Sequence, residues 1–301
     1  MKLRDDNGQT IVFTMLALIG VLGMTALVLD VGSWFRAQRA AQATADAAAL
    51  AGAQFLPNGS AAASGALTQA GKNGGGVAGV DITITSKLSP SDTIGLQATR
   101  PATSFFAKVL AVADFTVHAK AKASSELPAM AQFVAPMVVS KDHPLLAGSG
   151  CPCFGPSTTL NFDPMGAPGA FGMLNLDGGG GTVGTSDEAD WILRGNTKML
   201  PLGDYNSDPG AKFSSSQLQD ALNDRIGTVL LFPVFSKLIG TGQNAKYNII
   251  GWVGFYLDGF SIQGNNAILN GHFTSYIAHG IQATSGNSQP DFGVRTISLV
   301  E

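Results

Sequence analysis

The densest group of side chains that could carry chemistry is acidic. Asp187, Glu188 and Asp190 could serve in acid–base catalysis or in calcium binding. They follow Thr185 and Ser186, and the pattern Thr-Ser-Asp-Glu is typical of a capping box, where carboxylates are favoured by the helix dipole. We interpret the cluster as the start of a helix.

Two loops resemble catalytic motifs only in part. The run from Asp177 to Gly181 is as glycine-rich as a phosphate loop, but no Gly-Lys-Ser/Thr follows it. We interpret it as a loop, with calcium binding as the alternative. Gly148-Ser149-Gly150 does not complete the Gly-x-Ser-x-Gly turn of a serine hydrolase. The sequence therefore predicts no catalytic residue, no cofactor and no enzyme, and an extracytoplasmic hydrolase is the weakest hypothesis.

The potential metal ligands are dispersed. Cys151 and Cys153 are separated by one residue, which is too short for an easy disulfide, and they are too few for zinc without remote ligands. We interpret them as structural or incidental, with a redox or metal role as the alternative. Two histidines are isolated, and two lie seven apart and so on opposite faces of one strand; we expect surface or packing roles for His118, His143, His272 and His279.

Four aromatic side chains, Trp252, Phe255, Tyr256 and Phe260, could form a platform for a sugar or a partner. Trp252 and Tyr256 fall on one face of a predicted strand, so core packing is the simpler interpretation.

Composition narrows the class of protein. The 301 residues suffice for one large domain or two modest ones, 45% of them are hydrophobic and only 13% are charged. The net charge of −3 provides no cationic field for a phosphate backbone, so we expect no nucleic-acid partner.

The N-terminal region contains a candidate membrane span. After a leader at residues 1–9, about 20 residues from Thr10 to Leu29 carry no charge, which matches a hydrocarbon core of roughly 30 Å. Trp34 and Phe35 follow where interfacial aromatic residues occur. A cleaved signal is one alternative, but its apolar region is normally shorter. A buried core helix is the other, but a helix of that kind rarely runs so long without a polar face. We predict a single-pass anchor in the lipid bilayer.

The same helix is expected to continue as far as Leu56, because alanine, glutamine and arginine favour helix and Pro57 follows. Gly32 could kink it. A polar stripe at spacing i,i+4 comprises Gln38, Gln42 and Asp46. Small side chains on another side form a helix-packing seam at Ala41, Ala45, Ala48 and Gly52. The seam packs either on the chain's own sheet or on a partner subunit.

The rest of residues 30–125 is expected to form a small α+β module. Residues 60–79 indicate a short helix and a turn, and residues 80–88 and 93–99 alternate as two strands of a hairpin. Pro101 is expected to open a helix that includes Phe106, before a strand at residues 115–123.

A boundary is expected near Ser124–Met130, and residues 126–301 form the distal domain. Short apolar runs between glycine, asparagine and proline predict a mostly β fold with a sandwich or barrel-like core. Two short helices interrupt it, each with a capping box, at Thr185–Glu188 and Ser214–Gln217. The fold class is α+β.

Several segments resemble a known family. Asn7–Gly32, followed by ADAAALAGAQ at Ala45–Gln54, resembles the N-terminal region of the TadE/TadG-like proteins of tight-adherence (Flp) pilus assembly. Arg100–Ala123 is similar to the block that follows there. GAFGMLNLDGGGG, GWVGFYLDGF and DFGVRTISLV are similar to the distal domain of the larger TadG-type members.

The resemblance implies a minor pilin-like or assembly component in the cytoplasmic membrane, with its N-terminus inside and its bulk outside. Charge alone leaves the orientation open. Expected partners are other pilus or secretion subunits and a second copy of the chain through the N-terminal helix. Phe13 stands where processing after Gly8 would normally be accompanied by glutamate, so processing is not predicted. The alternative function is a membrane-tethered adhesin or ligand-binding module.

Overall fold

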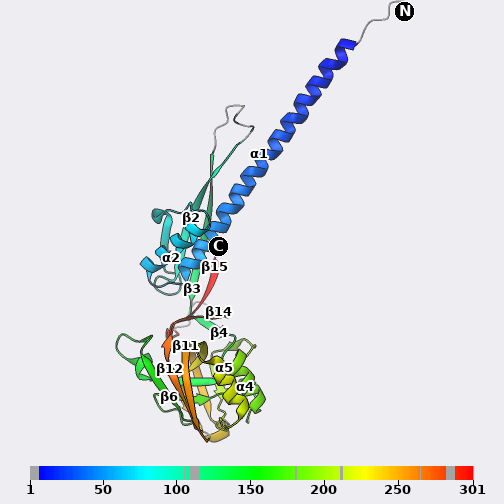
Figure 1. Cartoon of the computed structure of the whole chain (residues 1–301). Helices are drawn as coiled ribbons and strands as arrows, with labels where there is room; N and C mark the ends of the chain where they lie inside the picture. Colours follow the sequence, from blue (N-terminus) through cyan, green and yellow to red (C-terminus); the bar gives the residue numbers. More distant parts are fainter. Residues whose placement is uncertain are drawn as a thin grey trace, which may run out of the picture. The chain divides into compact units, whose positions relative to one another are not determined.

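The computed structural model describes residues 7–104, 106, 108, 115–179, 182–210, 213–264, 266–282 and 289–300 (Figure 1). The chain divides into two compact units. Unit 1 comprises Met1–Ser125 and Ile297–Glu301, and unit 2 comprises Glu126–Thr296. The sequence assigns all of residues 126–301 to the distal domain, whereas the last residues of the chain belong to unit 1.

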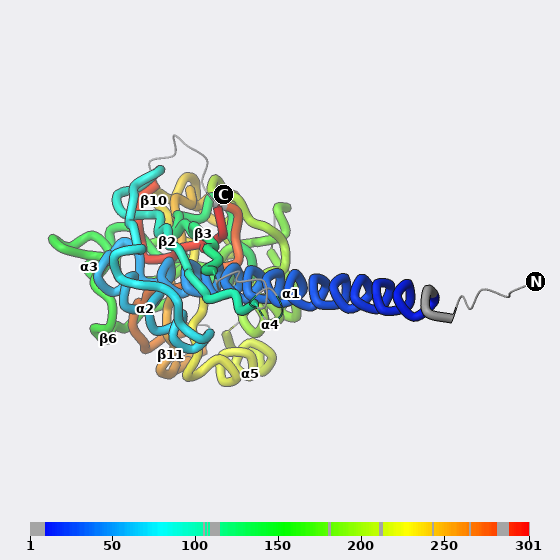
Figure 2. Tube along the Cα trace, turned by 90° about the horizontal axis from the view of Figure 1, so that it is seen from above, coloured from blue at the N-terminus to red at the C-terminus, as the bar shows by residue number. Residues whose placement is uncertain are grey.

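Unit 1 begins with one long helix, α1 (Asn7–Ala53), of 47 residues. It corresponds to about 70 Å of helix, and it passes through Gly32 without a break (Figure 2). The predicted long helix is therefore confirmed, and it ends three residues before Leu56.

A short helix and a sheet complete unit 1. Helix α2 (Gly59–Lys72) begins where the side chain of Asn58 accepts the amide of Ala61 at 3.1 Å. Strands β1 (Ile82–Thr85), β2 (Thr93–Ala102) and β3 (Phe115–Glu126) form an antiparallel sheet, with β15 (Val294–Val300) following β3 in the strand order; a short 3₁₀ turn, η1, covers Gly79–Asp81. Alanines of both helices pack on the apolar face of β2, at Ile94, Leu96 and Ala98.

One predicted helix of unit 1 is wrong at its start. Pro101 lies within β2, opposite Thr116 of β3. Strand β1 pairs only with residues 93–96 of β2, so Pro101 lies where β2 has a free edge, and a residue without an N–H is tolerated there. Beyond β2 the structure describes Thr103, Ser104, Phe106 and Lys108 of the predicted helix; its other residues, Val109, Leu110 and Ala113 among them, lie outside the described residues.

Unit 2 is mostly β, as predicted, and its main sheet closes on itself. The strand order is β10 (Val229–Ile239), β5 (Met137–Ser140), β7 (Ala170–Met173), β6 (Ser157–Phe162), β12 (Asn266–Thr274), β11 (Lys246–Gln263). The additional pairing of β10 with β11 joins the two ends into a barrel, and β9 (Gly203–Asn206) extends from β11. The sequence predicted either a sandwich or a barrel-like core, and the structure has the barrel.

The barrel contains both parallel and antiparallel pairs. β5 runs parallel to β10 and β6 runs parallel to β7, whereas the other neighbours are antiparallel. Its interior is filled by large side chains that include Phe171, Phe232, Phe255 and Phe273, with Phe232 and Phe255 stacked at 5.1 Å between ring centroids. The remaining strands are short: β4 (Pro128–Ala131), β8 (Leu200–Pro201) and β14 (Gly280–Gln282) form a small sheet, and β13 (Tyr276–Ile277) pairs with β15.

Two helices lie at the predicted places, α4 (Thr185–Arg194) and α5 (Ser216–Arg225), besides the short α3 (Pro144–Ala147) and the 3₁₀ turn η3 (Gly242–Asn244). Their predicted capping boxes are wrong. The N-cap of α4 is Gly184 and that of α5 is Ser215, and neither makes a side-chain cap hydrogen bond. The side chain of Glu188, the last residue of the predicted box of α4, is buried.

The expectation that Cys151 and Cys153 would not pair is also wrong. They form a disulfide with 4.4 Å between their Cα atoms. The amide of Cys151 donates to the carbonyl of Gly148 and that of Cys153 donates to the carbonyl of Leu145. These turn hydrogen bonds draw the two Cα atoms closer than an extended chain would, to the short end of the range that a disulfide spans.

Candidate membrane anchor and helix-packing site

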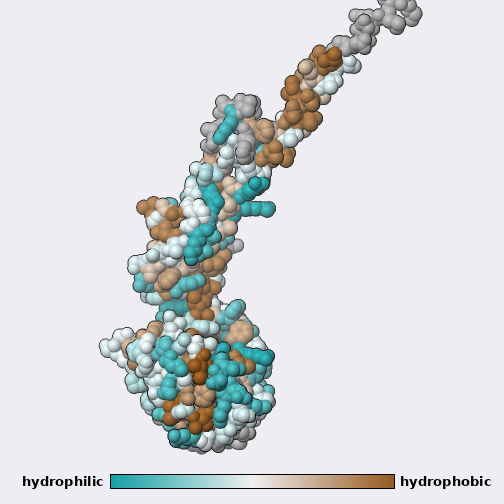
Figure 3. Space-filling view, viewed as in Figure 1, coloured by the Kyte–Doolittle hydropathy of each residue, from teal (hydrophilic) through white to brown (hydrophobic). Residues whose placement is uncertain are grey.

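The N-terminal half of α1 is not packed against any other described part of the chain. From Thr10 to Leu29 every side chain is exposed except Ala26, which is half-buried, and Figure 3 shows the apolar surface that results. The helix is long and apolar enough to cross a membrane by length and composition. A stretch of this kind fits a membrane anchor.

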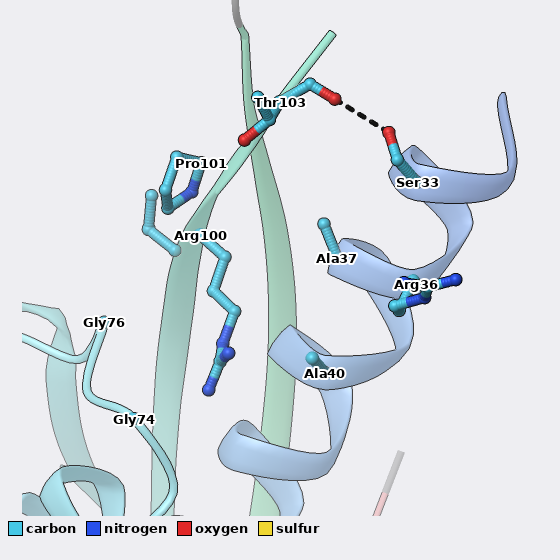
Figure 4. Close-up of a pocket in the computed structure, with 10 residues that line it drawn as sticks. Ser33, Arg36, Ala37, Ala40, Gly74, Gly76, Arg100, Pro101 and Thr103 are labelled. Carbon is cyan, nitrogen blue, oxygen red and sulfur yellow. Dashed lines mark hydrogen bonds between the residues drawn. The ribbon is translucent and has the colours of Figure 1, made fainter. Parts of the chain in front are cut away.

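The first charge after the apolar stretch is buried. Asp30 is 2% exposed, and its carboxylate oxygens accept the amide of Phe106 at 3.2 and 3.1 Å. One turn further on, the hydroxyl of Ser33 donates to the carbonyl of Thr103 at 2.7 Å (Figure 4). These bonds attach the end of β2 and the residues after it to α1.

An aromatic contact reinforces this attachment. Trp34 Nε1 donates to Ser104 Oγ at 3.3 Å, and the Trp34 ring meets Phe115, the first residue of β3, edge to face at 5.0 Å. Trp34 and Phe35 were predicted as interfacial residues. The sequence did not predict that residues about 70 positions further on would contact them, because nothing in its local pattern encodes that pairing.

The polar stripe of α1 binds backbone carbonyls of β3. Gln38 Nε2 donates to the carbonyl of His118 at 3.1 Å, and Gln42 Nε2 donates to the carbonyl of Lys120 at 3.2 Å and to Asp46 at 2.8 Å. Four residues of helix rise about 6 Å and two residues of strand about 6.8 Å, so the two spacings match. The i,i+4 stripe was visible in the sequence, but its acceptors were not.

The small-residue seam lies in the interior of unit 1. The side chains of Ala41, Ala45 and Ala48 are fully buried, and Gly52 is buried beside them. A Cβ on Gly52 would approach Ile94 Cδ1 of β2 to 2.6 Å and the carbonyl oxygen of Ala62 in α2 to 2.9 Å. The seam is thus covered by the chain's own α2 and β2.

An open groove of about 540 Å³ lies between α1 and β2 (Figure 4). It is lined by Ser33, Arg36, Ala37, Ala40, Gly74, Gly76, Thr99, Arg100, Pro101 and Thr103. Arg100 Nη2 donates to Thr44 Oγ1 at 3.1 Å and to the carbonyl of Asn73 at the end of α2. Arg100 therefore joins α1, α2 and β2.

The side chains first considered for catalysis lie apart. Asp187 is exposed, Glu188 is buried, and Asp190 forms an exposed ion pair with Arg194 at 3.4 Å. Among the described residues, no three His, Cys, Asp or Glu side chains lie together as a metal site would require. The glycine-rich loop is described only through Gly179.

The histidines have separate surroundings. His143 caps α3 by accepting the amide of Leu145 at 3.1 Å, it packs against Phe273, and burial lowers its pKa from 6.5. His272 lies in β12, where its ring stacks on Tyr256, whereas His279 lies beyond β13. The two are therefore not on one strand.

The four aromatic side chains do not form one platform. Trp252 and Phe255 are buried in different hydrophobic clusters of unit 2, while Tyr256 and Phe260 are half-buried. Trp252 Nε1 donates to the carbonyl of Pro128 at 3.2 Å, which satisfies the indole in the interior.

Comparisons with known proteins relate one part of the chain to a family. No protein of curated function and no solved structure matches it. Residues 8–54, which cover nearly the whole of α1, match the Tad family model, described as Flp pilus-assembly TadE/G-like.

Proposed function

We propose that this chain is a minor pilin-like structural or assembly component of a tight-adherence type pilus or a related secretion system, and not an enzyme. The observation that carries the proposal is the division of α1 into two functional halves. Residues 10–29 are apolar and exposed, the seam from Ala41 to Gly52 is buried in unit 1, and the family match spans both halves.

One continuous helix couples the two halves mechanically. Because α1 has no break at Gly32, a force or displacement on the membrane half is transmitted to the folded half without a hinge. This suits a subunit that is held in a membrane and presents a folded domain to other subunits.

We place the N-terminus in the cytoplasm and units 1 and 2 outside. Lys2 and Arg4 before the apolar stretch are balanced by Arg36 and Arg39 after it, so the direction rests on the family resemblance. The disulfide between Cys151 and Cys153 supports it, because disulfides persist in oxidising compartments and are rare in the cytosol.

Protease treatment of intact cells, combined with membrane fractionation, tests this topology. We expect the chain in the membrane fraction and units 1 and 2 to be degraded from outside. Protection of unit 2 in intact cells, with degradation only after lysis, would contradict the proposal.

Partners are tested by photo-crosslinking in cells that assemble the pilus. A photoreactive residue at Leu22, which is 60% exposed, is expected to capture a pilus subunit or a second copy of this chain. The same residue in place of the buried Ala48 should capture neither. Deletion of the gene should reduce surface pili; unchanged pili would count against a structural or assembly role.

A membrane-tethered binding module is the second candidate. A cavity of about 210 Å³ in unit 2 is lined in part by Phe133, Trp191, Tyr276 and Arg225. Arg225 Nε has no hydrogen-bond partner there. The cavity is smaller than usual small-molecule sites, so it would hold only a small anionic group. Specific binding of acidic glycans or peptides, lost in Arg225→Gln and independent of any pilus, would favour this candidate.

A further inference from the structure

Phe106, which follows β2 in the chain, lies at the end of the apolar stretch of α1. Asp30 directly follows Leu29, the last residue of that stretch, and its carboxylate accepts the amide of Phe106. Figure 1 shows β2 and β3 running beside α1 towards its N-terminal half. Phe106 therefore lies within a few ångströms, along the helix, of the point where the hydrocarbon layer would end.

A carboxylate at that boundary needs a partner. Charged groups that enter the hydrocarbon layer are costly unless they are paired or solvated. Asp30 is 2% exposed, and the amide of Phe106 is one of the groups that satisfy it. The chain after β2 thus shields the charge at the very position where α1 would leave the lipid.

Around this contact, large apolar side chains remain exposed. Phe106 is 46% exposed, Phe115 is 40% exposed and Phe35 is 65% exposed, and the ring of Phe115 contacts Trp34, which precedes Phe35 in α1. Trp34 is one helical turn beyond Asp30, about 6 Å, which is comparable to the headgroup layer on one side of a bilayer. Aromatic side chains are enriched in that layer.

We propose that Phe106 and Phe115, together with Trp34 and Phe35, insert into the interfacial layer of the bilayer, so that these four side chains form a second membrane contact beside the spanning helix. The inference rests on the proposed membrane anchor. It follows from the hydrogen bond that holds Phe106 at Asp30, the residue directly after the apolar stretch, and the occupant proposed for these aromatic side chains is lipid. The second contact restricts tilting and rotation of unit 1 about α1.

Tryptophan quenching by brominated lipid tests the inference. The full chain, carrying Trp34→Phe, is reconstituted in phosphatidylcholine vesicles whose acyl chains are brominated, in one preparation near the headgroup end to report on Phe106→Trp and in another near the bilayer centre to report on Ile19→Trp. Trp191 and Trp252 remain as a constant background, because they are 8% and 3% exposed within unit 2. Three probes are compared: Ile19→Trp within the apolar stretch, Phe106→Trp, and Val80→Trp, where the side chain is 90% exposed in unit 1.

We expect the added emission of Phe106→Trp to fall about twofold in brominated lipid, as interfacial insertion requires, while that of Val80→Trp is unchanged. Quenching of Ile19→Trp but not of Phe106→Trp would overturn the second contact and leave the anchor intact. No quenching of Ile19→Trp would overturn the anchor itself. A blue-shifted but unquenched Phe106→Trp would show that protein covers this surface, which also overturns the inference. Phe115→Trp provides an independent probe if Phe106→Trp does not fold.

Discussion

The side-chain amide of Gln38 in α1 donates a hydrogen bond to the backbone carbonyl of His118 in β3, at 3.1 Å. Gln42, one turn later, does the same for Lys120. A helix that starts as a membrane anchor thus continues as a helix whose side chains bind backbone carbonyls of β3.

Replacement of both glutamines is expected to leave the backbone carbonyls of His118 and Lys120 without these hydrogen bonds. Gln38→Ala combined with Gln42→Ala should destabilise unit 1 by about 1–2 kcal/mol, since each hydrogen bond contributes about 0.5–1 kcal/mol. Hydrogen exchange of the full chain in detergent should be faster at residues 115–121. The exposed Gln54 provides the control, because Gln54→Ala should leave this exchange unchanged. Equal exchange in both variants would show that the bonds do not protect β3.

Gly52 permits the close approach of α1 to α2 and β2. A methyl group there would lie 2.9 Å from the carbonyl oxygen of Ala62 and 2.6 Å from Ile94 Cδ1. Gly52→Ala should therefore destabilise unit 1 and lower its thermal midpoint. Overpacking is expected to reduce the free energy of unfolding by about 1–3 kcal/mol, and the higher helix propensity of alanine offsets up to about 1 kcal/mol of this. Gly52→Leu should disrupt the packing of α2.

Gly32 supplies a control in the same helix. A Cβ at Gly32 meets nothing within 4 Å, so Gly32→Ala should be neutral or stabilising. A Gly52→Ala variant as stable as Gly32→Ala would mean that α2 can shift to admit the methyl group.

Asp92 organises the turn between β1 and β2. Its carboxylate accepts the backbone amides of residues 87–89 at 2.6–2.8 Å and the hydroxyl of Thr93 at 2.8 Å. Burial alone would raise the pKa of Asp92, but these four hydrogen bonds outweigh it and lower the pKa from 3.8. Because the folded-state pKa is the lower one, the stabilisation is present above about pH 3.8 and is lost as pH falls towards the folded-state value.

Asp92→Asn should therefore destabilise unit 1 at neutral pH, by about 1–3 kcal/mol, and the difference from the natural chain should shrink in acid. Urea unfolding followed by circular dichroism at neutral and acid pH measures both effects. Asp81→Asn, in the same unit, is the control. A difference that stays constant with pH would exclude titration of Asp92 as its source.

Two phenols, the buried Tyr247 and the half-buried Tyr205, are expected to make unit 2 sensitive to alkali. Burial raises the pKa of Tyr247 and of Tyr205 to about 12, from 10.0. Each hydroxyl also donates to a proline carbonyl, of Pro164 and Pro201 respectively. A raised folded-state pKa means that the stabilisation is complete below about pH 10 and is lost as pH rises to about 12.

The urea midpoint of unit 2, followed by the fluorescence of its buried tryptophans, should therefore fall between about pH 10 and pH 12. Tyr247→Phe should lose about 1 kcal/mol at neutral pH, since one hydrogen bond is removed, and should show a smaller alkaline loss. Tyr256→Phe, at a half-buried surface position, is the comparison. If both variants kept the full alkaline loss, ionisation of Tyr247 would not be its cause.

The sequence by itself determined the long helix and its two halves. Twenty uncharged residues followed by alanine and glutamine specify a helix through local propensity and solvent preference, and Pro57 ends it. Alternation of apolar residues likewise located β1 and β2, because a half-buried strand shows its buried face at every second position, whereas short apolar runs indicated that unit 2 is mostly β.

Only the tertiary structure decided what each surface contacts. The closure of the barrel by β10 and β11, the cover of the seam by α2 and β2, and the acceptors of Gln38 and Gln42 all join residues that are distant in the chain. Pro101 and the pair Cys151–Cys153 show the same limit, since a free strand edge and a tight turn overrode their usual local preferences. Local patterns record which side of an element is buried, but the partner that buries it is selected by the packing of the whole unit.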